Sequence, residues 1–370
     1  DANTTGASNT AVGSGSLGAN TTASDNTAVG NQAGTAVTTG TKNTLIGAEA
    51  GDAITTASGN VALGYSALGA CTTGADNVAI GMNAGLSVTT GLRNTLIGDL
   101  SGDALTDADD NVAIGSFALS ADTLGSRSTA IGKAALGSQN FTSATNANNT
   151  AVGYQAGVSV TTGTLNTLIG GQAGDALSVG DANIAVGYTA LGSDTKGNRS
   201  TAIGTGALAT QNFTSATNVY NTAVGDSAGA AVTTGVQNTF IGGLAGDANT
   251  TASTNTAVGY ASLSANTTGP ANTAVGKDSL LSNTTGRDNT AVGFGSLLTN
   301  TTGVENNANG MYSLRFNTTG DNNTALGYQA LHRNTTADNN TAVGRNALEQ
   351  NTTGSGNVAV GYNSGDALTT

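Results

Sequence analysis

Hydrophobic and polar residues follow one short pattern that repeats along the whole chain. The segment Asn-Thr-Ala-Val-Gly at residues 272–276 returns, in the same or a closely similar form, from residue 9 to residue 361. Its closing glycine occurs 21 times, spaced by 17 residues eighteen times and by 21 residues twice. A fixed period of this length is typical of a solenoid, in which each repeat forms one coil. The sequence therefore predicts an all-β parallel β-solenoid, a β-roll or β-helix, of 21 coils with a 17-residue period.

Each coil is numbered here from its asparagine, so that coil positions 1 to 5 read Asn-Thr-Ala-Val-Gly. Thr-Ala-Val and the Ala-Leu segment after it read as short strands, because β-branched residues recur at fixed places and helical periodicity is absent. We therefore expect two strands and two or three turns per coil. The glycines at positions 5 and 15, such as Gly276 and Gly286, are expected to supply turns with positive φ. Stacked coils would form parallel sheets with about 4.8 Å between strands.

Side-chain volumes at positions 3, 9 and 12 vary together. Where position 9 is glycine, position 12 is usually aliphatic, with Asn249 as an exception; where position 9 is leucine, position 12 is usually polar. The second coil of each internal pair of glycine coils also has a larger residue at position 3, at Leu45, Leu96, Leu168 and Phe240. Close-packed interiors require such compensation. Positions 3, 9 and 12 are therefore predicted to line one internal cavity.

Position 4 takes no part in this exchange and is Val, Ile or Leu in every coil except the one with Asn309. Neighbouring residues of a strand point to opposite faces, so position 4 is expected to face outward if position 3 faces inward. A repeated outward aliphatic residue would form an exposed apolar stripe, which a soluble monomer rarely carries. We therefore predict a parallel homo-oligomer, with a trimer favoured. Its interface is expected to include Val12, Val29, Ile46, Ile80, Val152, Val224, Val275 and Val343.

The pattern divides the chain into two regions of one predicted continuous rod. Residues 1–254 mix glycine and leucine coils and contain two longer loops, at 137–148 and 209–220. Residues 255–370 form a more uniform series of leucine coils. The long spacings lengthen the turn after position 9, so these loops are expected to protrude. Aromatic residues on such loops are candidates for ligand contact, and they are Phe141, Phe213 and Tyr220.

Composition and charge exclude several classes of partner. The formal net charge is −12 and no basic run occurs, which argues against nucleic acid, because nucleic-acid binding depends on Lys and Arg contacts to phosphate. No apolar run approaches the roughly 20 residues that a membrane-spanning helix needs, so no membrane insertion is predicted. The single cysteine excludes a disulfide within the chain.

The later coils resemble a known family of repeats. Residues 327–331 read Gly-Tyr-Gln-Ala-Leu, followed by Asn-Thr-Thr at 334–336 and Asn-Thr-Ala at 340–342. This series resembles the repeats of bacterial and phage tail-fibre-domain proteins, and the stacked Asn-Thr-Ala-Val-Gly units are similar to the head repeats of trimeric autotransporter adhesins. The resemblance implies a trimeric β-roll and an extracellular place, on a cell surface or a virion. The glycine coils and long loops depart from the simplest family pattern.

Residues that often carry chemistry do not form a catalytic constellation here. His332 stands alone in a turn and reads as a surface residue, and Cys71 reads as a semi-buried substitution for the usual Asn at position 12. Asp107, Asp109 and Asp110 are either a solvated turn or a calcium site. The acids at position 10 fit turns better than the paired carboxylates of polysaccharide hydrolysis, and they are Asp52, Asp103, Asp175, Asp247 and Asp366. We predict no enzyme, no cofactor and no metal site.

The predicted function is structural: an extracellular tail-fibre-like or adhesin-like shaft that provides reach, rigidity and surface attachment, with a cell-surface or glycan receptor as a further partner. One alternative is a glycan-binding solenoid, because tyrosine recurs at position 6, where it could stack on sugars or pack over the corner. A second alternative is ice binding through threonine ladders, because position 1 asparagines and the threonines at positions 13 and 14 should form ladders. Adjacent threonines, such as Thr284 and Thr285, point to opposite faces if extended, which disfavours ice binding.

Overall fold

A computed structural model describes residues 3–370 of the chain; Asp1 and Ala2, which begin the predicted first region, lie outside the described residues. The protein is an all-β parallel β-solenoid of about 21 coils with a period of about 17 residues, which confirms the predicted fold class. Its residues group into two compact units, Asp1–Asn183 and Ile184–Thr370. The described residues contain no helix of the length and apolarity that crossing a bilayer requires.

The first unit contains one three-residue strand in each coil and two strands of two residues, one on the longer loop 137–148 and one in the coil before it. The coil strands are β1 (Thr10–Val12), β2 (Thr27–Val29), β3 (Thr44–Ile46), β4 (Val61–Leu63), β5 (Val78–Ile80), β6 (Thr95–Ile97), β7 (Val112–Ile114), β9 (Thr129–Ile131), β11 (Thr150–Val152) and β12 (Thr167–Ile169). The short strand β8 (Gly125–Ser126) of the preceding coil pairs with β10 (Thr145–Asn146) of the longer loop.

The second unit repeats this plan. Its coil strands are β13 (Ile184–Val186), β15 (Thr201–Ile203), β17 (Thr222–Val224), β18 (Thr239–Ile241), β19 (Thr256–Val258), β20 (Thr273–Val275), β21 (Thr290–Val292), β22 (Asn307–Asn309), β23 (Thr324–Leu326), β24 (Thr341–Val343) and β25 (Val358–Val360). The short strand β14 (Gly197–Asn198) pairs with β16 (Thr217–Asn218), which lies on the longer loop 209–220. The predicted change of composition at residue 255 falls inside this unit.

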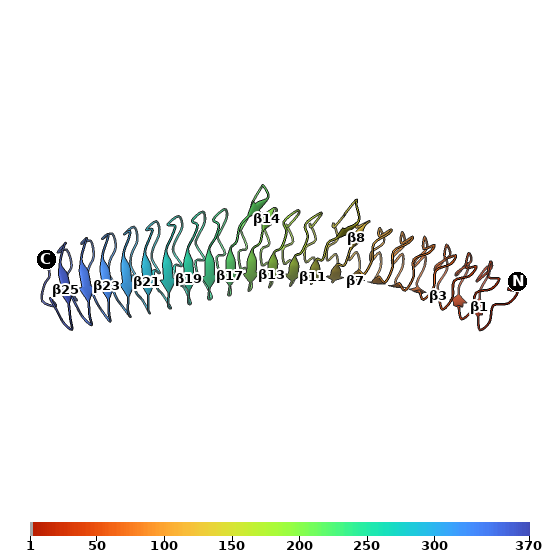
Figure 1. Cartoon of the computed structure of the whole chain (residues 1–370), viewed down its shortest axis with the longest axis horizontal. Helices are drawn as coiled ribbons and strands as arrows, with labels where there is room; N and C mark the ends of the chain where they lie inside the picture. Colours follow the sequence, from red (N-terminus) through yellow and green to blue (C-terminus); the bar gives the residue numbers. More distant parts are fainter. Residues whose placement is uncertain (1–2) are drawn as a thin grey trace. The chain divides into compact units, whose positions relative to one another are not determined.

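Within each unit the strands pair in parallel and in register. Thr273, Ala274 and Val275 of β20 lie opposite Thr290, Ala291 and Val292 of β21, so every side chain stacks on its copy one coil away. Figure 1 shows backbone standing out from the neighbouring coils near the labels β8 and β14, where these strands pair with β10 and β16 of the predicted long loops 137–148 and 209–220.

The Ala-Leu segment after the first strand is not the second strand that the sequence predicts. Positions 7 and 9 both have left-handed backbone there, as Asp278 with φ 56° and Leu280 with φ 50° illustrate. The chain instead forms consecutive tight turns, in which the amide of Asn283 donates to the carbonyl of Leu280 at 3.2 Å. The amide of Leu280 still donates to Ser296 in the next coil at 3.0 Å. Inter-coil hydrogen bonding therefore persists without an extended backbone.

The two glycine positions serve different purposes. Gly276 at position 5 has φ +128°, and a Cβ added there would lie 2.7 Å from the carbonyl oxygen of Gly293. Gly286 at position 15 does not have the positive φ that we expect from the sequence. A Cβ on Gly286 would instead lie 2.5 Å from the oxygen of Gly303 in the next coil. Position 15 is therefore restricted to small residues by close stacking of backbones and not by a left-handed turn.

The interior of each coil is narrow and contains positions 3, 9 and 12, as predicted. Phe240 at position 3 is fully buried, and a Cβ added to Gly246 at position 9 of the same coil would lie 2.4 Å from the Phe240 ring. A Cβ on Gly229, one coil earlier, would lie 2.8 Å from the same ring. The large residue at position 3 thus fills the space left by two glycines. This filling also explains Asn249, because Phe240 leaves no need for an aliphatic residue at position 12.

This packing predicts that a glycine coil can be converted into a leucine coil. Phe240→Ala alone leaves a cavity and should cost about 3–5 kcal/mol, and Gly246→Leu alone overpacks the coil and should cost about 1–3 kcal/mol. The double variant reproduces the Ala257 and Leu263 of the next coil, where position 9 has nearly the same φ (56° at Gly246 and 55° at Leu263). Its loss should be smaller than the sum of the two single losses, because Leu at 246 refills the space beside it, although the space beside Gly229 stays open.

Urea-induced unfolding of the four proteins, followed by circular dichroism, measures this coupling. Additive losses in the double variant would contradict a shared cavity for positions 3 and 9.

Candidate functional site

The outer face of the coil strands is the most extensive candidate for a functional surface. Positions 2 and 4 point outward, opposite the buried position 3, as Thr273 and Val275 do on either side of fully buried Ala274. Position 4 is half-exposed along most of the stack, because each side chain covers part of its copy. It is exposed at 45% in Leu63, 39% in Ile169 and 40% in Ile241. The expected division between inward position 3 and outward position 4 is confirmed.

A ladder of buried asparagines lies at position 1, immediately before each coil strand. Oδ1 of Asn272 accepts hydrogen bonds from both the backbone amide and Nδ2 of Asn289, each at 3.1 Å. Nδ2 of Asn289 also donates to the carbonyl of Gly303 at 2.8 Å. The amide group suits this place because it donates and accepts at once, so identical copies satisfy one another. The predicted asparagine ladder is confirmed.

A second buried ladder runs through position 12 in the second unit, from Asn249 of a glycine coil into the leucine coils that follow it. Nδ2 of Asn283 donates to Oδ1 of Asn266 at 2.9 Å and to the carbonyl of Gly286 at 2.9 Å. The bonded series continues from Asn249 through Asn266, Asn283, Asn300, Asn317, Asn334 and Asn351. Two neighbouring amide ladders therefore stiffen this part of the coil stack.

Cys71 occupies position 12 in the first unit and takes over part of the asparagine's role. Its side chain is buried, and Sγ donates to the carbonyl of Gly74 at 3.3 Å. Burial raises the pKa of the thiol to about 11, so the reactive thiolate is scarce near neutral pH. The cysteine is a buried packing residue, more completely enclosed than the semi-buried position that we expect from the sequence.

In the longer coils a glutamine takes the place of a missing asparagine in the ladder. Position 1 is serine at Ser128, and the space of the missing amide is filled by Gln139, which comes from position 12 of the same coil. Nε2 of Gln139 donates to Ser128 Oγ at 3.0 Å and to Asp122 Oδ2 at 2.6 Å. Oε1 of Gln139 accepts from Nδ2 of Asn149 at 2.8 Å, and the ladder continues. The sequence signal for this arrangement is the coincidence of serine at position 1 with glutamine at position 12.

The second long coil has the same network, formed by Asp194, Ser200, Gln211 and Asn221. Gln211 Nε2 donates to Asp194 Oδ2 at 2.6 Å and to Ser200 Oγ at 2.8 Å, and Asn221 donates to Gln211 Oε1 at 2.8 Å. The repeated geometry indicates a structural device, because both copies use the same partners in the same order. Sequence reasoning did not identify either network.

Phe141 and Phe213, which we expect from the sequence to be exposed on the long loops, are buried. They are only 6% and 7% exposed. The Phe141 ring covers Gly125, where an added Cβ would lie 2.8 Å from Cδ2 of the ring. The expectation fails because each loop folds back over the preceding coil and uses its aromatic ring as a cover.

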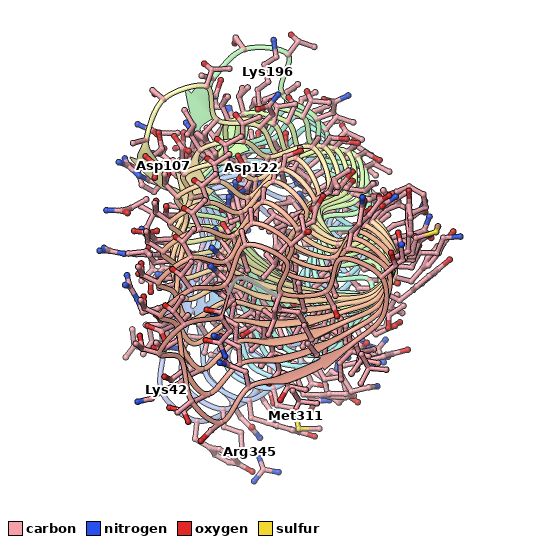
Figure 2. All side chains as sticks on the ribbon, turned by 90° about the vertical axis from the view of Figure 1, so that its right-hand side faces the viewer. Lys42, Asp107, Asp122, Lys196, Met311 and Arg345 are labelled. Carbon is pink, nitrogen blue, oxygen red and sulfur yellow. The ribbon has the colours of Figure 1, made fainter. Side chains whose placement is uncertain are left out.

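Tyr220 is the exposed member of the predicted contact site, at 49%. Its hydroxyl accepts from Nη1 of Arg199 at 2.7 Å, and the Arg199 guanidinium lies 5.7 Å from the ring centre. The structure therefore does not present the three predicted residues as one exposed aromatic group. In Figure 2, Lys196, the residue before β14, lies where the chain stands out from the rest of the ribbon.

The paired threonines at positions 13 and 14 do not form a flat array. The Thr284 hydroxyl is half-buried and donates to the backbone carbonyl of Thr301 at 3.0 Å, whereas Thr285 is exposed. The ladder at position 13 thus connects each hydroxyl to the main chain of its copy. The two threonines differ in exposure, as expected for adjacent residues that point to different sides.

The acidic residues near 110 have separate partners. Asp107 accepts from the Thr90 hydroxyl, Asp109 accepts from the backbone amide of Leu92 at 2.8 Å, and Asp110 accepts from Nε of Arg93 at 2.7 Å. Each carboxylate therefore stabilises the coil before it. Within residues 3–370, no group of three or more His, Cys, Asp or Glu has the arrangement of a metal site.

The acids at position 10 are partly buried in their turns. Burial raises the pKa of Asp52, Asp103 and Asp175, with additional repulsion from Glu49 for Asp52 and from Asp99 for Asp103. Asp247 accepts from the Ser264 hydroxyl at 2.6 Å. These residues occupy the same position of separate coils rather than facing each other across a cleft.

His332 is not the surface residue that its lone turn position suggests, because it is only 8% exposed. Its ring packs edge-on against Phe316 and Tyr312, with ring centres 5.1 Å and 6.2 Å apart. Nδ1 lies 3.1 Å from the Tyr312 carbonyl oxygen. The histidine is therefore enclosed by an aromatic group that spans neighbouring coils of the second unit.

Comparisons with known proteins do not assign the chain to a family. A scan against protein-family models finds no matching model, and a search of the curated proteins finds no significant match. The resemblance to tail-fibre repeats accordingly stays a prediction.

The buried Asp122 predicts a pH-dependent contribution to stability. Burial is the largest influence on this carboxyl and raises its pKa above the ordinary value of 3.8, against the opposing effect of hydrogen bonds from Phe141, Gln139 and Gly125. The native state then binds the proton more tightly than the unfolded chain does. The stability that protonation contributes is therefore full below the unfolded pKa and is lost as pH rises through the raised native pKa.

Asp122→Asn should remove this dependence, so the difference in unfolding free energy between wild type and variant should fall across that window and then level off. Urea titrations at a series of pH values measure it. Asp110→Asn is a control of opposite sign, because Arg93 lowers the pKa of the exposed Asp110 carboxyl. A difference for Asp122→Asn that is constant with pH would contradict the prediction.

Proposed function

We propose that the chain forms the shaft of an extracellular fibre, assembled as a parallel homotrimer. The observation that carries this proposal is the outward row of aliphatic side chains at position 4. Parallel strands that are apolar on both faces are normally covered on both faces, and a long exposed apolar stripe is unfavourable for an isolated soluble chain. A second copy of the chain has the same period, so its row matches the first row coil for coil.

The internal ladders support a mechanical role. The asparagines at position 1 are buried and bonded to their copies, and the second ladder from Asn249 to Asn351 adds another continuous set of bonds. A buried amide that loses its partner costs about 1–3 kcal/mol, so bending or local opening of the stack is resisted at each coil. Repetition then gives length, and the ladders give stiffness.

The proposed role requires no catalysis. Asp107, Asp109, Asp110, Asp247 and His332 have partners within the coils, and these partners account for their positions. The resemblance to tail-fibre and adhesin-head repeats supports an extracellular place, on a cell surface or a virion, and supports three chains.

Charges introduced at position 4 should dissociate the assembly without unfolding the coils. In the triple variant Val258→Glu, Val275→Glu and Val292→Glu, three adjacent outward side chains become carboxylates that cannot be buried against another chain at low cost. Native mass spectrometry should show wild-type trimers and a large fraction of variant monomers, and circular dichroism should show that the β content is kept.

A matched control places the same charges on a different side of the coil, at the exposed Thr268, Thr285 and Thr302. These Thr→Glu changes should leave the trimer intact. A wild-type chain that stays monomeric in the mass spectrum, or equal dissociation of both triple variants, would overturn the proposed interface.

Ice binding is a second candidate for the same face, because position 2 adds a row of threonines beside the aliphatic row. Thr256, Thr273 and Thr290 stack in register on the outer side of their strands. A flat threonine-bearing face occurs in ice-binding solenoids, and this face would serve only in a chain whose outer strands are uncovered. Thermal hysteresis of the wild type that disappears in the position 4 triple variant would favour ice binding over the fibre.

A further inference from the structure

The turn at positions 10 and 11 carries large side chains at one place in the stack. Position 11 is Ala, Ser or Thr in eighteen of the 21 coils. The three exceptions lie in three successive coils and are Phe316, Arg333 and Gln350. Position 10 of the same three coils is Arg315, His332 and Glu349. Because eighteen coils close this turn with small residues, packing of the turn does not require the large ones.

These residues form an arginine–aromatic patch in the second unit, defined by Tyr312, Arg315, Phe316, His332 and Arg333. The Arg315 guanidinium lies 4.4 Å from the centre of the Tyr312 ring and 5.1 Å from that of Phe316. His332 packs edge-on against both rings. Arg315 is thus held in place by stacking, which leaves its hydrogen-bond donors free of a carboxylate.

The patch borders an open hollow of about 620 Å³. The hollow is lined by Phe316, His332, Arg333, and the threonines Thr299, Thr318 and Thr335. Phe316 is 40% exposed, so part of its ring faces the solvent. The surface therefore combines an accessible aromatic ring, a cationic side chain and a concave floor of stacked threonines.

Positive charge at this place is unusual in a chain with a net charge of −12. The ion pairs among the described residues involve Arg93, Lys277 and Arg287, and they leave Arg315 and Arg333 without a carboxylate partner. Nε of Arg315 is buried and has no hydrogen-bond partner in the protein. An anionic ligand that pairs with the outer nitrogens of half-exposed Arg315 or with exposed Arg333 would gain charge-assisted bonds.

Neighbouring side chains extend the patch along the coils. Phe294 packs edge-on against Tyr312 with ring centres 5.2 Å apart. Arg345 lies 5.4 Å from the centre of the Tyr328 ring. Figure 2 shows Met311 and Arg345 projecting away from the ribbon. The cationic and aromatic character therefore spans several coils, as a linear ligand would require.

We propose that the arginine–aromatic patch binds acidic saccharides. Arg333 and Arg315 pair with carboxylate or sulfate groups, whose oxygens match the planar guanidinium. The exposed face of Phe316 packs against the C–H groups of a sugar ring, whose hydrogens carry partial positive charge toward the negative face of the aromatic ring. The patch supplies few cations on an acidic chain, which disfavours a polyphosphate, because nucleic acids need a row of Lys and Arg contacts.

A role of the patch in surface attachment rests on the proposed fibre function. The binding itself depends only on residues within one chain and is measured apart from the number of chains in the assembly. Failure of saccharide binding and failure of trimer formation are therefore separate results.

Isothermal titration calorimetry with the full chain tests the proposal using four probes: a galacturonate hexasaccharide, a sulfated chondroitin hexasaccharide, neutral maltohexaose and an oligothymidylate. We expect saturable binding of at least one acidic hexasaccharide, no comparable binding of maltohexaose, and weakening at high salt. The first two probes distinguish carboxylate from sulfate as the preferred group.

Variants locate the site. Phe316→Thr introduces the residue that Thr299 has at the same coil position, and Arg315→Gln with Arg333→Gln removes both charges; each change should weaken binding about tenfold or more. Arg93→Gln with Arg287→Gln, a charge-matched control at two ion pairs outside the patch, should change affinity less than about twofold. Circular dichroism verifies that every variant keeps its fold.

Three results would overturn the proposal. They are absence of saturable binding to both acidic hexasaccharides, equal binding of maltohexaose, and equal affinity in the folded arginine variant. Tighter binding of the oligothymidylate than of either acidic hexasaccharide would assign the patch to single-stranded nucleic acid instead.

Discussion

The structure depends on the in-register hydrogen bonding of each coil to the next one. The amide of Thr273 donates to the carbonyl of Asn289 at 2.8 Å, and the amide of Gly276 donates to Val258 at 2.8 Å, so one coil is bonded in both directions. Successive coils are one strand spacing apart, so only side chains that pack against their own copies fit between them. Gly276 illustrates the limit, because its Cα region faces the carbonyl of Gly293 directly.

The same stacking explains why a chain with so few large apolar residues has a stable interior. Asparagine is suited to a ladder because one end of its amide donates while the other accepts, and each copy satisfies the next. Where Ser128 interrupts the ladder, Gln139 brings the missing amide from the other side of the cavity. The volume exchange around Phe240 follows the same logic for apolar groups, since two adjacent glycines make space for one ring.

Regular repetition also provides a background against which departures can be judged. The long loops depart from the period, but Phe141 and Phe213 are buried and their backbone amides donate to Asp122 and Asp194 of the preceding coils, so the loops maintain the coil. The patch around Arg315 departs from the period without an equivalent structural need, and its Phe316 and Arg333 side chains remain accessible. Exposure combined with an unpaired charge therefore separates a candidate binding site from a structural irregularity.

The sequence by itself determined the solenoid, its period, and the division between inward position 3 and outward position 4, because these follow from spacing and from side-chain volumes that vary together. It also predicted the asparagine ladder, since a polar residue that recurs at one position of a stacked repeat must meet its copy. Only the tertiary structure decided that the Ala-Leu segment is a turn and that Gly286 is small for reasons of stacking, because backbone angles are set by inter-coil hydrogen bonds. Only the tertiary structure showed that Phe141, Phe213 and His332 are buried and that Arg315 stacks near the rings of Tyr312 and Phe316. These arrangements depend on contacts between coils that no local pattern encodes.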